Sequence, residues 1–106
     1  MIYVKVDLQK PASGYRANPG EEVVFRWLLR SAPIAADERY WMRIRTTDGA
    51  VVDNYLTSDP WRYYRVPSGA VGVFTWTVTV VKVDAANSIL GAASPESDRW
   101  TFVAQP

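Results

Sequence analysis

The sequence contains no cysteine and no histidine. Without cysteine the chain can form neither a disulfide nor a thiolate nucleophile. Without histidine it lacks the imidazole that most zinc sites and the Ser-His and Cys-His catalysts use. A phosphate-binding loop is missing too, because the glycine-containing segment 67–72 has no lysine and no predicted helix after it. We therefore expect no catalytic residues, no metal site and no cofactor.

Carboxylates leave two narrower alternatives open. Asp53 and Asp59 are the candidates for a paired-carboxylate hydrolase, although a sandwich of 106 residues offers little room for a cleft between them. A calcium site would use loop carboxylates such as Asp37, Glu38 and Asp48. No ligand spacing stands out among them, and aspartate is also a common turn-forming residue.

Long apolar runs and an excess of one charge are also missing. No apolar stretch approaches the roughly 18 residues that a membrane-spanning helix needs. Twelve basic and eleven acidic residues leave a net charge of +1, whereas binding to nucleic-acid phosphates requires a surplus of lysine and arginine. We expect neither a nucleic-acid partner nor insertion into a membrane.

Aromatic residues make up 13% of the chain, and apolar and polar residues alternate with a period of two, which is typical of strands with one buried face. This alternation and the intervening turn residues predict strands at residues 2–8, 22–29, 39–46, 50–56, 61–66, 73–83 and 98–104. Short strands at this spacing are the pattern of a β-sandwich. We expect residues 1–106 to form one all-β domain, a two-sheet antiparallel β-sandwich of about seven strands, excised from a longer multidomain protein.

Three local features follow from the same pattern. Asp48-Gly49 indicates a two-residue hairpin with a type I′ turn, which needs positive φ at both central positions. The segment 84–95 is predicted to be a loop in which Ile89 and Leu90 close one edge of the core. Within 73–83, alternate aromatic and valine side chains are predicted to face the core, and the threonines between them to face solvent: Thr75, Thr77 and Thr79.

Three segments resemble a known group of modules. Val23–Trp27 looks like the second strand of a fibronectin type III-like domain, Phe74–Val78 looks like the sixth strand, and Ser94–Phe102 looks like the last one. Immunoglobulin-like sandwiches share this type of pattern. The chain departs from the family at Phe74, where members usually have a tyrosine whose hydroxyl ties back to the preceding loop.

The resemblance implies a non-catalytic module that spaces, orients or adheres within a bacterial surface or secreted protein. Its location would then be extracellular or in the cell envelope, and its partners would be neighbouring domains of the parent chain or another protein. The sequence has no Arg-Gly-Asp tripeptide, so integrin-type adhesion has no support.

Six aromatic and arginine residues form the candidate binding surface: Trp41, Arg43, Trp61, Tyr63, Tyr64 and Arg65. The side chain of Trp41 is out of phase with its apolar neighbours, and alternation cannot bury every aromatic side chain within 61–65. Three interpretations remain open for this surface. It is an interface with a domain or subunit, a polysaccharide-binding site that stacks sugar rings, or cation–π packing on an outer sheet face.

Overall fold

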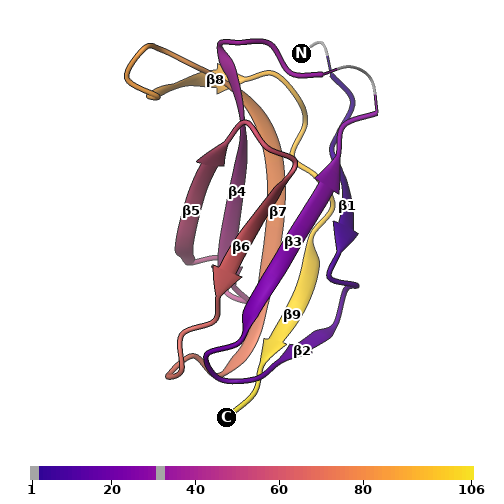
Figure 1. Cartoon of the computed structure of the whole chain (residues 1–106), viewed down its shortest axis with the longest axis vertical. Helices are drawn as coiled ribbons and strands as arrows, with labels where there is room; N and C mark the ends of the chain where they lie inside the picture. The colour runs from indigo at the N-terminus through magenta and orange to yellow at the C-terminus, as the bar shows by residue number, and fades with distance from the viewer. Residues whose placement is uncertain (1–2, 31–32) are drawn as a thin grey trace.

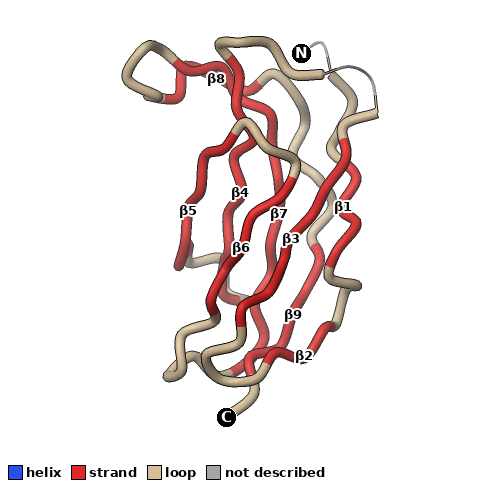
Figure 2. Tube along the Cα trace, viewed as in Figure 1, coloured by secondary structure: helices blue, strands red, loops and turns tan. Residues whose placement is uncertain are grey.

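The computed structural model describes residues 3–30 and 33–106. These residues form nine strands and no helix, so none of them provides a helix that could span a membrane. The strands make two sheets packed face to face (Figure 1, Figure 2). The all-β sandwich is thus confirmed, with more strands than expected: β1 (Asp7–Lys10), β2 (Tyr15–Ala17), β3 (Glu22–Leu28), β4 (Glu38–Thr46), β5 (Val51–Thr57), β6 (Trp61–Arg65), β7 (Gly72–Val83), β8 (Ile89–Ala92) and β9 (Trp100–Ala104).

The smaller sheet has the order β1-β3-β6, and the larger one has the order β2-β9-β7-β4-β5, with β8 also paired to β7. All neighbours are antiparallel except β2 and β9, which run parallel with Tyr15 opposite Phe102. The predicted two-sheet antiparallel sandwich is confirmed, and this short pair is the exception to its antiparallel order among the described strands. The alternation could not reveal β2, because a strand of three residues is too short to show a period.

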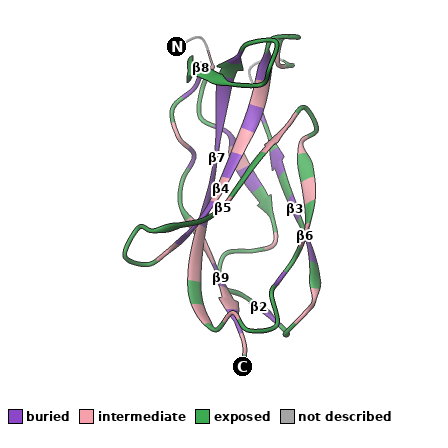
Figure 3. Ribbon diagram, turned by 90° about the vertical axis from the view of Figure 1, so that its left-hand side faces the viewer, coloured by how far each residue is buried: buried purple, intermediate pink, exposed green. Residues whose placement is uncertain are grey.

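The core is an aromatic contact between the two sheets. Phe25 of β3 lies 4.9 Å from Trp76 of β7 and 5.6 Å from Phe102 of β9, measured between ring centroids. Buried and exposed positions alternate along β3 (Figure 3), as the sequence predicts. Burial of a large side chain such as Phe25 stabilises the fold by about 1.5–3 kcal/mol. Trp27 is buried with it, and Trp100 is partly buried against the same cluster.

The hairpin between β4 and β5 exists, but its turn is not of type I′. Gly49 has a φ of 96° and Asp48 has no positive φ. The Gly49 N–H donates to the Thr46 carbonyl (3.0 Å), and the Thr46 N–H donates to the Ala50 carbonyl (2.9 Å). This is a three-residue loop in which a type I turn is followed by a left-handed glycine, an arrangement that suits the twist of the strands equally well.

Two predictions at the ends of the sandwich are wrong. The first strand begins at Asp7, and Val4 before it is 56% exposed, while Ile2 lies outside the described residues. Ile89 and Leu90 do not close the core, since they are 40% and 67% exposed. They belong to β8, which pairs with the last residues of β7 at one end of the molecule, beyond the smaller sheet (Figure 1).

Thr77 and Thr79 are buried, which contradicts their predicted exposure on a solvated face. For Thr77 the cause is the segment between β8 and β9, which brings Glu96 over the outer face of β7. The Thr77 hydroxyl donates to Glu96 (3.0 Å) and accepts a hydrogen bond from Arg45 (3.2 Å). A residue on the outer face of this sheet is therefore not automatically in contact with water.

Between the end of β8 and the start of β9, serine side chains take the place of backbone carbonyls in the hydrogen bonds to β7. The Ser94 hydroxyl accepts the N–H of Val80, and the Ser97 hydroxyl accepts the N–H of Val78, both at 2.9 Å. Pro95 lies between the two serines and has no N–H to donate. The edge of β7 thus keeps its hydrogen bonds across a break in its neighbour.

Substituting Ser97→Ala should destabilise the protein by about 1–3 kcal/mol, because the buried N–H of Val78 loses its acceptor and water cannot replace it. Urea unfolding followed by tryptophan fluorescence measures the change. Ser13→Ala is the matched control, since the Ser13 hydroxyl accepts the Thr101 N–H (3.1 Å) at an exposed position and should change stability by less than about 0.5 kcal/mol. An equal loss in both variants would contradict this role of Ser97.

Candidate interaction surfaces

The six predicted surface residues do not form one surface. Trp61 pairs with Arg26 and Tyr63 with Val24, so both rings lie on the outer face of the smaller sheet together with Arg65. Trp41 and Arg43 alternate with buried residues of β4 and lie on the outer face of the larger sheet. The remaining residue, Tyr64, pairs with the buried Val23 and faces inward. The sandwich separates the candidate surface into two opposite faces.

The first surface is the aromatic stripe, defined by Val24, Leu28, Trp61 and Tyr63 on the outer face of the smaller sheet. Tyr63 is 62% exposed, and the other three are each 36–37% exposed. Arg26 lies near Trp61, with its guanidinium 5.9 Å from the ring centroid, which is a loose cation–π contact. The stripe thus exposes two aromatic rings from one strand beside two aliphatic side chains from its neighbour.

The charges of the arginines on this face of the smaller sheet are only partly neutralised. Arg65 donates to the Gly20 carbonyl (2.9 Å) and lies 3.8 Å from the carboxylate of Glu22. That ion pair is well exposed on both sides, and such pairs contribute little to stability. Within residues 3–30 and 33–106, Arg26 forms no ion pair. Arg65 thus lies at one end of the aromatic stripe, and Arg26 lies within it, between Val24 and Leu28.

The second surface is the arginine cluster, defined by Arg43, Arg45 and Glu96 on the outer face of the larger sheet. One oxygen of Glu96 accepts hydrogen bonds from Arg43 (2.5 Å) and Arg45 (2.9 Å). The Arg43 guanidinium also lies 3.9 Å from the ring centroid of Trp41, a close stacking contact. Trp41 and Arg43 therefore pack against each other on the surface, and one carboxylate faces two guanidinium groups.

Electrostatics fix the charge state of this cluster. Burial alone would raise the pKa of Glu96, but the hydrogen bonds from Arg45 and Thr77 and the charges of Arg45 and Arg43 outweigh it, so this pKa is lowered. Burial lowers the pKa of Arg43, and the charges of Arg45 and Arg99 act in the same direction against the attraction of Glu96. Positive charge is in excess here, with three arginines near one acid.

A shallow depression adjoins Trp41 and separates β5 from the turn between β7 and β8. It is lined by Trp41, Asn54, Tyr55, Leu56, Asn87 and Ile89. Asn87 has a φ of 61°, a left-handed conformation that asparagine tolerates better than most residues. The carboxylate of Asp84 holds this turn by accepting the N–H groups of Ala86 and Ser88, both at 2.9 Å. Two amide side chains therefore stand beside a partly exposed indole.

Sequence reasoning missed Arg62, which faces inward between the edge strands of the two sheets. Its guanidinium lies 4.1 Å from the ring centroid of Tyr55 and 4.9 Å from that of Tyr64, and it forms an ion pair with Asp53. Asp53 was one of the acids considered for hydrolysis, and here it bridges β5 to β6. The sequence indicated this position only through spacing: Arg62 and Tyr64 are two residues apart, so both side chains lie on the same face of the strand. Among the described residues, no three His, Cys, Asp or Glu side chains gather into a metal-ligating group.

No protein-family model and no curated protein matches the sequence. Solved structures do match. The fibronectin(III)-like modules of Clostridium thermocellum CbhA superpose with a TM-score of 0.57 at 14% identity, over 94% of this chain and 94% of theirs. The fold is a fibronectin type III-like β-sandwich. CopC from Methylosinus trichosporium OB3b is similar too, with a TM-score of 0.55 at 16% identity, over 95% of this chain and 94% of its own. At these identities the likeness is one of fold.

The lowered pKa of Glu96 gives a pH-dependent contribution to stability. A carboxylate whose pKa is lower in the folded than in the unfolded state stabilises the fold fully above the unfolded value, about 4.3, and loses that contribution as the pH falls through the folded value. Glu96→Gln should cost about 1–2 kcal/mol at pH 7, since two arginines lose their counter-charge.

The difference in stability between wild type and Glu96→Gln should therefore shrink as the pH falls below about 4. Thermal unfolding followed by circular dichroism from pH 7 to low pH measures it. Glu22→Gln is the control, because its ion pair with Arg65 is long and exposed and its loss should have little effect at any pH. A constant difference for Glu96→Gln over the whole pH range would contradict the assignment.

Proposed function

We propose that this chain is a non-catalytic interaction module of a bacterial surface or secreted protein. It contacts a neighbouring domain of its parent chain or another protein through the aromatic stripe. The observation that carries the proposal is the exposure of Trp61 and Tyr63 side by side on one strand, flanked by Val24 and Leu28. Tryptophan and tyrosine are enriched in the buried parts of protein interfaces.

The chemistry of the stripe supports a protein partner. Aromatic rings offer a large contact area at a small cost in side-chain entropy, and arginine beside them supplies hydrogen bonds and charge. Arg26 and Arg65 add positive charge, so an acidic rim on the partner would complement the stripe. The extracellular or envelope location rests on the resemblance to the fibronectin(III)-like modules, which the fold supports.

A polysaccharide partner is the second candidate, and the depression beside Trp41 favours it. There an indole lies next to the amides of Asn54 and Asn87, and sugar binding combines ring stacking with such hydrogen-bonding groups. The excess positive charge of the arginine cluster would select an acidic sugar polymer. This candidate uses the opposite face from the aromatic stripe, so the two can be tested separately.

Photo-crosslinking tests the protein partner. A photoreactive phenylalanine analogue placed at Tyr63 in the producing cells should crosslink one defined protein, or one defined domain of the same chain. The same analogue at Val71, which is 60% exposed but outside the stripe, is the matched control and should not form that product. Addition of Trp61→Ala should abolish the product from position 63. Identical products from both positions would overturn the proposal.

Tryptophan fluorescence during titration with neutral and acidic polysaccharides tests the second candidate. A saturable change that is lost in Trp41→Ala and kept in Trp61→Ala would place sugar binding at the depression. A change that depends on Trp61 would instead assign the aromatic stripe to sugar binding and overturn the protein-docking proposal. No change with any polymer would eliminate the second candidate.

A further inference from the structure

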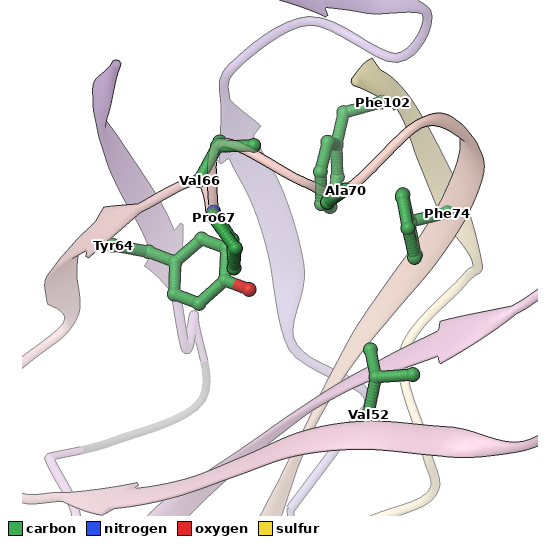
Figure 4. Close-up of a pocket in the computed structure, with 7 residues that line it drawn as sticks. All are labelled: Val52, Tyr64, Val66, Pro67, Ala70, Phe74 and Phe102. Carbon is green, nitrogen blue, oxygen red and sulfur yellow. The ribbon is translucent and has the colours of Figure 1, made fainter. Parts of the chain in front are cut away.

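An apolar pocket opens between the two sheets at the end of the sandwich opposite β8. It has a volume of about 230 Å³. Figure 4 shows that its walls come from several elements: Val52 of β5, Tyr64 of β6, Phe74 of β7, Phe102 of β9, and Pro67 and Ala70 of the loop between β6 and β7. This pocket belongs to neither of the two outer surfaces.

Two features of the chain create the space. First, β5 has a bulge, since Ile44 pairs with Asp53 but the next residue of β4 pairs with Val51. The extra residue is Val52, which lines the pocket while its side chain stays 50% exposed, as bulges commonly re-aim a side chain. Second, the loop after β6 consists largely of small residues, and Ala70 is the one that meets the pocket. Among the described residues, the rings of Tyr64, Phe74 and Phe102 line this gap without filling it.

The walls are held in position by the core. Phe74 stacks on Phe102 with ring centroids 5.4 Å apart and planes 20° apart. Tyr64 packs against Phe25 at 6.0 Å between centroids, and the guanidinium of Arg62 lies 4.9 Å from its ring. Three aromatic rings are therefore fixed before any ligand arrives, which limits the entropy that binding would cost.

Tyr64 supplies the pocket with its polar group. Its hydroxyl points into the space between Val52 and Phe74 (Figure 4), and within the described residues nothing in the protein hydrogen-bonds to it. Burial raises the pKa of Tyr64, and the charge of Asp53 raises it further against the opposing charge of Arg62. The hydroxyl thus keeps its proton at neutral pH and can both donate and accept a hydrogen bond.

We infer that this pocket binds a small aromatic compound of one ring, or two fused rings, that carries one hydrogen-bonding group, such as a phenol or an indole. An apolar cavity of about 150 Å³ is known to take up benzene, whereas drug-sized ligands need roughly 300 Å³ or more. The volume of about 230 Å³ lies between these limits. The ring would contact Val52, Phe74 and Phe102, and its polar group would meet the Tyr64 hydroxyl.

Phenol and toluene are the matched probes, since they have the same size and differ in the hydroxyl group. In methyl-selective NMR titrations, the Val52 and Ala70 methyl signals should shift and saturate with phenol, with a Kd on the order of 1 mM. Toluene should bind about fivefold more weakly, because it leaves the Tyr64 hydroxyl without a partner. Tyr64→Phe should weaken phenol binding about fivefold and leave toluene binding unchanged.

Filling the pocket provides the second test. Ala70→Leu should weaken both probes at least tenfold, because its larger side chain occupies the space, whereas Val71→Leu at the exposed neighbouring position should bind as the wild type does. Val52→Phe fills the pocket from the opposite wall and gives an independent check if Ala70→Leu alters the fold. The inference is overturned if neither probe produces saturable shifts, if Tyr64→Phe affects both probes equally, or if both filling variants bind normally.

Discussion

The contact between Phe25 and Trp76 joins the two sheets, and the positions of all the surfaces depend on it. Both side chains are completely buried, with ring centroids 4.9 Å apart. Successive side chains of a strand point to opposite faces of the sheet. When one residue is buried in this contact, the residues before and after it in the sequence therefore face outward. Burial of Phe25 places Val24 and Arg26 on the outer face, next to Tyr63 and Trp61. The aromatic stripe is thus a consequence of how the core is packed.

The core could be predicted from the sequence because it depends on one face of each strand. Alternation identified the inward residues of β3, β4 and β7 correctly. Alternation carries no information about what covers an outer face. Thr77 and Arg45 are buried there because Glu96 reaches them, and Glu96 is 51 residues from Arg45 along the chain. These long-range contacts depend on the path of the segment 93–97. This segment pairs with β7 through the hydroxyl groups of Ser94 and Ser97, and no periodicity in the sequence indicates such a pairing.

The candidate surface was only partly predictable for a related reason. The phase of β4 correctly placed Trp41 and Arg43 outward, but no local pattern states which sheet a strand joins. The assignment of β4 and β6 to different sheets decides that Trp41 and Trp61 lie on opposite faces. The bulge at Val52 is equally hidden, since it is a property of the pairing between two strands. Sequence reasoning therefore found residue types suited to binding, whereas their grouping required the structure.

Structures that share 14% and 16% identity with this chain have the same fold, which shows how few side chains the fold itself demands. A sandwich needs apolar residues on its inner faces and turns between its strands, and it places little constraint on the outer faces. Trp61 and Tyr63 lie on the outer face of the smaller sheet, where their side chains are 37% and 62% exposed and do not enter the core between the sheets. The sandwich fold therefore does not require aromatic residues at these two positions, and their cross-strand contacts with Arg26 and Val24 act within the smaller sheet alone.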